Sequence, residues 1–528
     1  MSTLIPSQSA HRYSPQLQYD TAPTRWLKQA AAILSLALAA SLHAQNAQPS
    51  PIVTHHYLVI YRNAVIPADA ETRTISAGAR LTQRNPHFGI IAAQSLGTED
   101  DATTMRRLAA QPNVEYVLHD RLVTAHRLHI QPILHPTFSV VIGPQAPYDT
   151  YYTSPQDWAV QQVGGYGNNI PGGPAFGPWN TTMGKGVRIA ILDSGVDAHH
   201  PDIAPNLALN LSEINQSALP SPCDDGTPQD QTGHGTWTAS LAAAAIGRGT
   251  GQVIGVAPAA TLLNIKVLER LPATIAGNGT TLAASCTAGE ATGLLSWVMQ
   301  GIEDAVTNRA DIISLSLGTI IDLSTGDGAG LKAVFDQVTY AASQAGVILI
   351  AAAGNDGYDL SNPRYLEIPA QSRNVLAIVA STNPACVENL SAGATCTPGP
   401  ISLPYYSNHG IPLNALAAPG GSYPSGTDLA VSGWVRGACS SGNPSTTDGP
   451  PTDSAHSYGC FNLGHTPYVQ AIGTSASAPL AAGVAALLRA AHPTWSADHI
   501  ISVMRSTAVP SPQLPVQQVD ATAALAQP

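Results

Sequence analysis

Residues 187–195 read VRIAILDSG, and this stretch decides the expected fold. The apolar run Val187–Leu192 ends directly at Asp193, and Ser and Gly follow. A short apolar run bounded by turn-forming residues is typical of a strand buried on both faces of a parallel sheet. In open α/β sheets, ligands lie beyond the carboxyl ends of the strands. Asp193 therefore stands where a functional side chain is expected, although an Asp here also commonly starts a turn.

The same strand pattern recurs along the chain, alternating with helical patterns. The further strand candidates are Leu262–Val267, Ile312–Leu317, Val347–Ala352 and Val375–Ala380. Helical spacing of apolar or small residues marks Trp297–Asn308, Leu331–Gln344 and Ser475–Ala491. This alternation predicts an α/β domain with a doubly wound, mainly parallel sheet and helices on both faces.

The chain ahead of this domain has a different pattern. Tyr57–Tyr61 and Val114–Leu118 are short β-rich runs, and the helical stretch Met105–Ala110 lies between them. We interpret residues 45–124 as a small α+β unit. Residues 125–155 carry His, Pro, Gly and Tyr without a period, which is typical of a linker. We expect a processing site in this linker and place the main domain at 156–528.

The first 44 residues indicate export. Arg25 and Lys28 precede the apolar run Ala30–Leu42, and a small-residue cleavage site ends at Ala44. The apolar run has 13 residues, whereas a helix that spans a bilayer needs about 20. We therefore predict a signal peptide with an extended N-terminal region at 1–44, and a secreted protein without a stable membrane anchor. The destination is extracellular, with the periplasm as the alternative.

Composition and cysteines limit the partners and the chemistry. Charged residues make up 11% of the chain and the net charge is −11, so no basic surface for nucleic acid is expected. Six cysteines in an exported chain predict disulfides, but six cysteines allow 15 pairings. No Cys-x-x-Cys spacing supports a zinc site. We favour the local pairs Cys386–Cys396 and Cys439–Cys460, which leave Cys223–Cys286 by elimination.

Three further polar residues stand in motifs of small side chains. His234 lies in GHGT (233–236), where glycines leave space beside the ring, but taken alone it is equally well a capping or buried His. Ser475 lies in GTSASAP (473–479), where a helix is expected to begin and its N–H groups would stabilise negative charge. Asn355 lies in AAAGNDG (351–357), just past another strand. A serine nucleophile needs a base and fixed oxyanion donors, which these residues would supply.

Together and in this order, the four motifs resemble the subtilisin family over roughly residues 158–509, and the order Asp, His, Ser is that of subtilisin itself. The resemblance implies a secreted serine endopeptidase that hydrolyses peptide bonds through an acyl-enzyme. Ser475 would be the nucleophile, His234 the general base and acid, Asp193 the orienting carboxylate and Asn355 the oxyanion donor. No cofactor is implied for this catalysis.

The resemblance also implies a substrate site. Ser316, Leu317 and Gly318 resemble the substrate-binding strand, while Ala353, Gly354 and Asp356 would line the pocket for the residue ahead of the scissile bond (P1). Asp356 would lie at the base of that pocket. We expect broad P1 tolerance, with large apolar residues favoured and basic ones accepted.

The remaining implications concern calcium and maturation. Asp202 matches a calcium ligand of the family, yet residues 247–251 lack the Asn or Asp that would complete a hard-cation site. Residues 57–121 are similar to an inhibitory pro-region that guides folding and is then cut off. We therefore expect an autoprocessed precursor, transiently inhibited by its own pro-region, that acts on proteins or peptides and is a monomer.

Other classes fit less well. An esterase of the α/β-hydrolase type would need a second Gly after Ser475 and another triad order. A zinc protease would need a His-Glu-x-x-His helix, which the sequence lacks. The remaining alternative is an inactive pseudo-protease that acts as a binding or adhesion protein. The complete set of triad and oxyanion residues argues against it, because a binding protein needs none of them.

Overall fold

The computed structural model describes residues 49–97, 99–126, 129–132, 149, 152, 157–170, 175–246, 252–274, 281–382, 401–410, 413–422, 434–442 and 458–528. All of these belong to one contact unit, Asn46–Pro528. The signal peptide predicted at 1–44, the predicted pair Cys386–Cys396 and the loop 247–251 lie outside the described residues.

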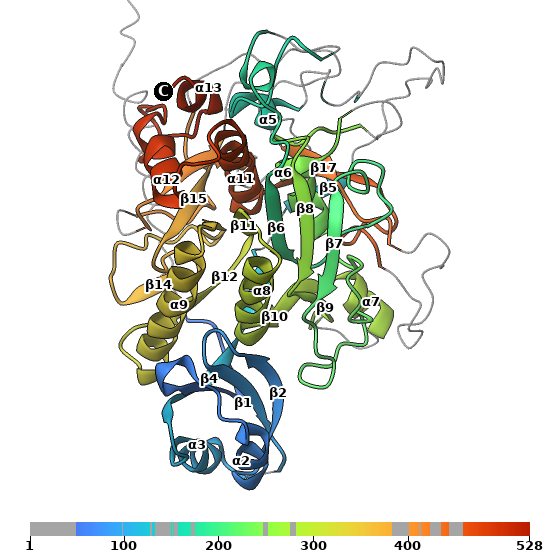
Figure 1. Cartoon of the computed structure of the whole chain (residues 1–528). Helices are drawn as coiled ribbons and strands as arrows, with labels where there is room; N and C mark the ends of the chain where they lie inside the picture. The colour runs from blue at the N-terminus through green and yellow to red at the C-terminus, as the bar shows by residue number, and fades with distance from the viewer. Residues whose placement is uncertain are drawn as a thin grey trace, which may run out of the picture. The chain divides into compact units, whose positions relative to one another are not determined.

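A seven-stranded sheet forms the centre of the larger domain, in the order β16-β15-β13-β11-β6-β8-β7 (Figure 1). All neighbouring strands in it are parallel, which confirms the predicted α/β fold. The strands are β6 (Arg188–Asp193), β7 (Leu207–Ser212), β8 (Thr261–Lys266), β11 (Ile312–Leu315), β13 (Ile348–Ala352), β15 (Val375–Ser381) and β16 (Leu416–Pro419).

Helices cover both faces of this sheet, as predicted. Successive side chains of a strand point to opposite faces, so Ile189 and Ile191 of β6 join one core and Ala190 and Leu192 join the other. The first core is closed by α5 (Trp158–Gln162), α6 (His234–Ala243), α11 (Thr474–Ala491), α12 (Ala497–Ser506) and α13 (Ala521–Leu525). The second core is closed by α8 (Leu295–Thr307) and α9 (Gly326–Gln344).

The run Ile312–Leu317, predicted as one strand, is divided between two sheets. β11 ends at Leu315, and β12 (Leu317–Asp322) leaves the central sheet to pair with β14 (Tyr365–Ile368). The apolar pattern continues through both strands because each is buried on both sides. Hydrophobicity alone therefore could not mark the break at Ser316.

An antiparallel α+β unit precedes this domain, as predicted. Its sheet, β4-β1-β3-β2, packs one face on two short helices and the other on α8 and α9 (Figure 1). The elements are β1 (Ile52–Tyr61), η1 (Arg62–Ala64), α2 (Ala70–Ser76), β2 (Ala79–Asn85), β3 (Ile90–Ser95), α3 (Asp101–Ala109) and β4 (Val114–Ala125). β4 thus continues seven residues beyond the predicted run Val114–Leu118.

Three further parts complete the described fold: an extension of the N-terminal sheet beyond β4, a separate three-stranded sheet and a few short elements. β9 (Glu269–Leu271) pairs with β10 (Glu290–Leu294), and α7 (Leu282–Thr287) lies between them in the chain. β5 (His129–Pro132) and β17 (Val435–Ala438) flank β18 (Tyr468–Ile472). Residues 129–132 therefore form a strand inside the segment predicted as a linker. The 3-10 helix η2 spans Pro178–Asn180.

Disulfides link Cys223 to Cys286 and Cys439 to Cys460, which confirms two of the predicted pairs. In the described part of the chain, no helix has both the length and the apolar character needed to cross a bilayer.

Candidate functional site

Asp193 and His234 form a buried pair at the carboxyl edge of the central sheet. Asp193 ends β6, and its Oδ1 lies 2.6 Å from Nδ1 of His234, the first residue of α6. The same oxygen accepts from the Ser194 N–H, and Oδ2 accepts from the Thr238 hydroxyl at 3.1 Å. These contacts fix the orientation of the imidazole ring and leave its Nε2 facing away from Asp193.

The start of α6 is held by a second buried carboxylate, Asp230. It accepts six hydrogen bonds, two of them from Thr236 and one from the Gly233 N–H. Burial raises the pKa of Asp230 in spite of these donors. A Cβ at Gly235 would lie 2.0 Å from the carbonyl oxygen of Gly195, so only glycine lets α6 approach the loop after β6 this closely. Asp230 and Gly235 therefore set the position of His234.

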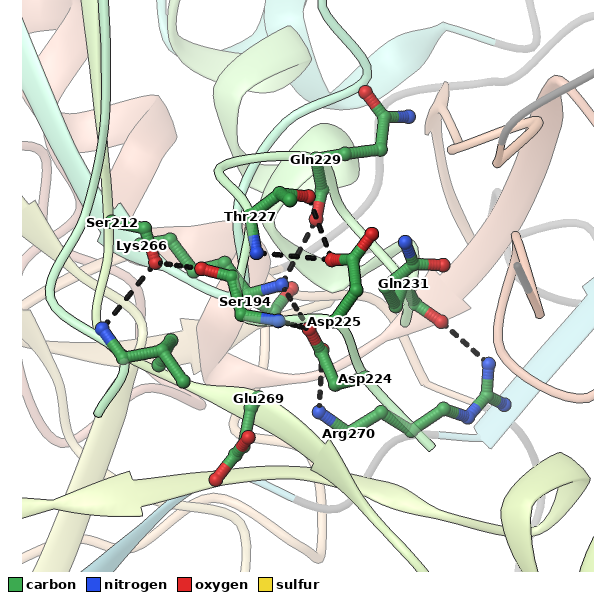
Figure 2. Close-up of polar contacts among 12 residues, drawn as sticks. Ser194, Ser212, Asp224, Asp225, Thr227, Gln229, Gln231, Lys266, Glu269 and Arg270 are labelled. Carbon is green, nitrogen blue, oxygen red and sulfur yellow. Dashed lines mark hydrogen bonds and ion pairs between the residues drawn. The ribbon is translucent and has the colours of Figure 1, made fainter. Parts of the chain in front are cut away.

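Two buried cations anchor the loop that contains Asp230. Lys266 Nζ donates to Gln229 O and lies 2.7 Å from Asp224 Oδ1, while Arg270 Nη1 donates to Gln231 O at 2.6 Å. Figure 2 shows these groups close together, with the backbone N–H of Arg270 bonded to Asp224. We call Asp224, Asp230, Lys266 and Arg270 the scaffold network. Its buried charges are met by opposite charges or by hydrogen-bonding groups.

Glu269 lies beside the scaffold network in the same view (Figure 2). Its Oε2 accepts from the Gln216 amide at 2.5 Å. Burial raises the pKa of Glu269 to about 9, and the negative charge of Asp224 raises it as well. Glu269 is therefore protonated and neutral at neutral pH, so it adds no uncompensated charge.

Ser475 lies in the first turn of α11, and a hydrogen bond ties it to the strand region before β12. Pro479, four residues on, has no N–H to donate to the Ser475 carbonyl, as a regular helix would require. The hydroxyl of Ser316 donates to that carbonyl instead, at 2.9 Å. This hydrogen bond, which replaces the missing helical one, connects Ser475 to Ser316, the first residue of the predicted substrate strand.

The Ser475 hydroxyl and the imidazole are not hydrogen-bonded to each other. Ser475 Oγ lies 3.4 Å from Ser316 O, and among the described residues His234 Nε2 has no hydrogen-bond partner although it is buried. Catalytic hydrogen bonds are often long or misaligned before substrate binds. The structure therefore joins Asp193 to His234, and places Ser475 on α11, which packs against α6.

Asn355 is held by the residue that precedes Ser475. Its Oδ1 accepts from both the backbone N–H and the hydroxyl of Thr474, each at 2.8 Å. Because Thr474 takes the oxygen, the amide nitrogen is the end turned away from Thr474. This orientation is the one that an oxyanion donor needs.

Two strands of the N-terminal part pair with strands that lead into this site. At the end of β4, Thr124 pairs with Gly318 of β12 and with Thr292 of β10, and Ala125 pairs with Leu317. β5 begins four residues after Ala125, where His129 pairs with Ile472 of β18. β18 leads directly into Thr474 and Ser475. The end of β4 is therefore paired with the predicted substrate strand, and the start of β5 with the strand before Ser475.

His126, which directly follows β4, lines a cavity of about 170 Å³. Thr124, Gly318, Asn355, Asp356 and Glu367 also line it. The Nε2 atom of His126 lies 3.9 Å from Glu367 Oε1. Burial lowers the pKa of His126 to about 3, and the nearby His234 lowers it further. His126 therefore enters the cavity as a neutral ring.

The other predicted substrate-site residues have different surroundings. Leu317 and Ala353 are buried in the second core, so the backbone of these positions is what borders the cleft. Asp356 lines the cavity but is exposed, whereas Glu367 in the same cavity is buried. Asp356, which was predicted at the base of the P1 pocket, is thus the exposed one of these two carboxylates, and its role stays a prediction.

Asp202, the predicted calcium ligand, is fully buried and already accepts hydrogen bonds. Its Oδ2 accepts from the backbone of Gln252 and Val253 and from the Tyr468 hydroxyl, at 3.0 to 3.4 Å. The described residues contain no group of three or more His, Cys, Asp or Glu side chains that could hold a metal ion. Donors therefore already occupy Oδ2 of Asp202, and a calcium ion at this residue stays a prediction.

Sequence reasoning missed Asp230, His126 and Glu367. Asp230 gives no N-cap signal, because the N-cap residue of α6 is Gly233 and Asp230 lies three residues before it. No local signal existed for His126 or Glu367, because strand pairing brings them together from positions far apart in the chain.

Comparison with known proteins was made by sequence and by structure. The sequence model described as "Subtilase family" matches residues 184–524. An intracellular serine protease of Paenibacillus polymyxa is 32% identical over 220 residues, which are 40% of this chain and 56% of the relative. Subtilisin E of Bacillus subtilis strain 168 is 29% identical over 325 residues, 62% of this chain and 61% of the relative. The chain thus spans about three fifths of the length of these relatives.

Among solved structures, the epidermin leader peptide processing serine protease of Staphylococcus aureus is similar with a TM-score of 0.58. The alignment covers 89% of this chain and 98% of that one, at 18% identity. At this identity the likeness concerns the fold alone.

Proposed function

The chain belongs to the subtilase family, and on this premise we propose that it is a serine endopeptidase that hydrolyses peptide bonds in proteins. The observation that carries the proposal is the buried pair of Asp193, at the end of β6, and His234, at the start of α6. α6 packs against α11, the helix that holds Ser475. A carboxylate, an imidazole and a hydroxyl at a helix start are the groups that nucleophilic acyl transfer requires.

In the proposed reaction, Ser475 Oγ attacks the substrate carbonyl carbon while its proton passes to His234 Nε2. Asp193 holds the other ring nitrogen and stabilises the imidazolium. The Asn355 amide and the N–H groups at the start of α11 stabilise the oxyanion. His234 then protonates the leaving amine, and water releases the acyl group from Ser475 by the same steps with water as the nucleophile.

Substrates are proposed to bind as a strand between β10 and β12. The pairing of β4 with both strands supports this geometry, because it leaves backbone groups of Ser316, Leu317 and Gly318 beside an extended chain. The side chain ahead of the scissile bond would enter the cavity that His126, Asp356 and Glu367 line.

We further propose that residues 45–124 are an inhibitory pro-region and that the chain cuts itself between Ala125 and His129. β4 and β5 flank this segment on the two sides of the site, which supports it as the first substrate. The position of His126 in the cavity favours the bond after this residue. We also propose that a signal peptide at 1–44 directs secretion and that the mature enzyme is a monomer. A calcium requirement stays a prediction.

The test compares wild-type precursor with Ser475→Ala, and uses Ser477→Ala on the same helix turn as the matched control. Gel analysis and intact mass follow the N-terminal region while casein digestion is assayed. Loss of the serine in subtilisin lowers kcat about a millionfold, so Ser475→Ala should neither shed the region nor digest casein. Ser477→Ala should retain both activities.

The measured mass also locates the first cut, which is expected between Ala125 and His129. If wild type and Ser475→Ala both stay intact and inert over a range of pH, with and without calcium, the peptidase proposal is wrong and a binding role replaces it.

A further inference from the structure

The cavity beside the proposed cleavage site contains a carboxyl group without a full set of partners. Glu367, in β14, is 1% exposed, and among the described residues its Oε1 has no hydrogen-bond partner. A buried polar atom in this state costs free energy unless another group meets it. Glu367 therefore requires an explanation that packing does not supply.

The opposite strand leaves space for this carboxyl group. A Cβ at Gly318 would lie 1.9 Å from Glu367 Oε1, so any other side chain at 318 would displace the carboxyl. Gly318 is also the residue that pairs with Thr124 of β4. Gly318 therefore has two roles: its backbone pairs with β4, and its lack of a side chain leaves the space that the Glu367 carboxyl occupies.

The charges around the cavity are of one sign. Glu290, Asp356 and Glu367 line it, and neither Lys nor Arg is among its described lining residues. Burial raises the pKa of Glu367 well above its ordinary value, and the negative charge of Asp356 raises it further. An approaching cation would reverse this effect, because an opposite charge favours the ionised carboxylate.

His126 shows which substrate residue meets Glu367. It follows Ala125, whose backbone pairs with Leu317, and it is the side chain next to the proposed cut. The Nε2 atom of His126 and Oε1 of Glu367 are 3.9 Å apart, and neither has a hydrogen-bond partner in the described part of the chain. The side chain of His reaches toward the carboxyl group but does not bond to it.

We propose that Glu367 selects substrates with Lys or Arg at the residue whose carbonyl is attacked. Both side chains are longer than His and carry their charge at the tip, so they would close the gap to Oε1. A guanidinium also matches a carboxylate in geometry. The inference rests on the proposed peptidase function, and it replaces the expectation that large apolar residues are preferred.

The test measures kcat/KM of the mature enzyme on peptides that differ only at this residue, with Arg, Lys, Leu or Phe. Wild type should prefer Arg and Lys. Because removing one partner of a buried charge pair is costly, Glu367→Gln should lower the Arg-to-Leu ratio by about 100-fold. Asp359→Asn, which removes an exposed carboxylate just outside the cavity, should leave the ratio unchanged.

A second measurement needs no variant. Benzamidine should inhibit wild type competitively, and neutral benzamide should not at the same concentration. If Leu or Phe peptides are cut as fast as Arg peptides, or if Glu367→Gln leaves the ratio intact, the inference is overturned while the peptidase function stands. If wild type cuts none of the four peptides and does not digest casein, the proposed function itself fails.

Discussion

The scaffold network and the cavity at Glu367 both bury carboxyl groups, but they satisfy them differently. Asp230 accepts six hydrogen bonds, and Asp224 faces Lys266 at 2.7 Å. Glu367 has an oxygen with no partner among the described residues and faces a cavity. Burial itself is the same in both regions. The scaffold network satisfies its carboxyl groups without a ligand, whereas Glu367 keeps one oxygen without a partner among the described residues. Loss of charge should therefore lower stability in the scaffold network and change selectivity at Glu367.

The largest expected effect is on the network. Lys266→Met, in a Ser475→Ala background that prevents self-digestion, leaves the Asp224 charge buried without its partner. Breaking a buried pair in this way costs about 3–5 kcal/mol of unfolding free energy. Denaturant titration measures it, and adding Asp224→Asn should recover part of the loss. A loss under about 1 kcal/mol would mean that the pair does not hold this region together.

Asp230→Asn should have the next largest effect. The Asn amide nitrogen cannot accept the two hydrogen bonds that Thr236 donates to Oδ2, so buried donors lose their acceptor. We expect a loss of about 2 kcal/mol in unfolding free energy and a lower kcat, because His234 shifts. Asp225→Asn is the control, since Asp225 is exposed. Equal effects of the two variants would contradict a special role for Asp230.

An intermediate effect on stability is expected for the pair of His119 and Asp327, which joins the N-terminal unit to α9. His119 Nδ1 lies 2.6 Å from Asp327 Oδ2, and this hydrogen bond raises the pKa of His119. A raised pKa means that the pair stabilises fully below the ordinary His value near 6.5 and loses this contribution as pH rises through the raised value. His119→Gln should therefore destabilise the Ser475→Ala precursor by about 1 kcal/mol at pH 5.5 and by less at pH 9. Denaturant titration of both variants at the two pH values tests the sign, and an equal loss at both would refute it.

The smallest effect on stability is expected at Glu367. Glu367→Gln removes an unsatisfied carboxyl, so unfolding free energy should change by less than about 1 kcal/mol. Because the raised pKa of Glu367 makes the folded state less stable as pH rises above the ordinary Glu value, the variant should gain relative stability with pH. Denaturant titration in the Ser475→Ala background measures this. A loss as large as that of Lys266→Met would remove the distinction between the two regions.

Local sequence patterns predicted five of the seven strands of the central sheet, whereas the edge strands β7 and β16 were not among the strand candidates. β6 ends at Asp193 as predicted, because an apolar run and a turn signal lie next to each other in the chain. Helix starts were less well predicted: α9 begins at Gly326 rather than near Leu331, since Thr325 caps it by accepting from the Gly328 N–H. The capping residue lies several positions before Leu331, where the apolar helical spacing used for the prediction begins.

Long-range pairing explains what the sequence did not reveal. Glu367 lies beside Gly318 because β14 pairs with β12. The spacing of apolar residues predicts strands, but it does not predict which strands will pair. Asp356 was predicted at the pocket base from its place in the family motif, and it does line the cavity. Glu367, which lines the same cavity, stands 11 positions further on, outside that motif.

The pairing of β4 with β12 and of β5 with β18 has a kinetic consequence. Because both strands belong to the same chain as Ser475, the proposed first cut between them would be a unimolecular event. Its half-time would not change on dilution, whereas cleavage of any other protein would slow in proportion to enzyme concentration. Intramolecular placement of reacting groups corresponds to effective concentrations of about 10⁵ M or more. Maturation would therefore proceed at the same pace in a very dilute environment as in a concentrated one.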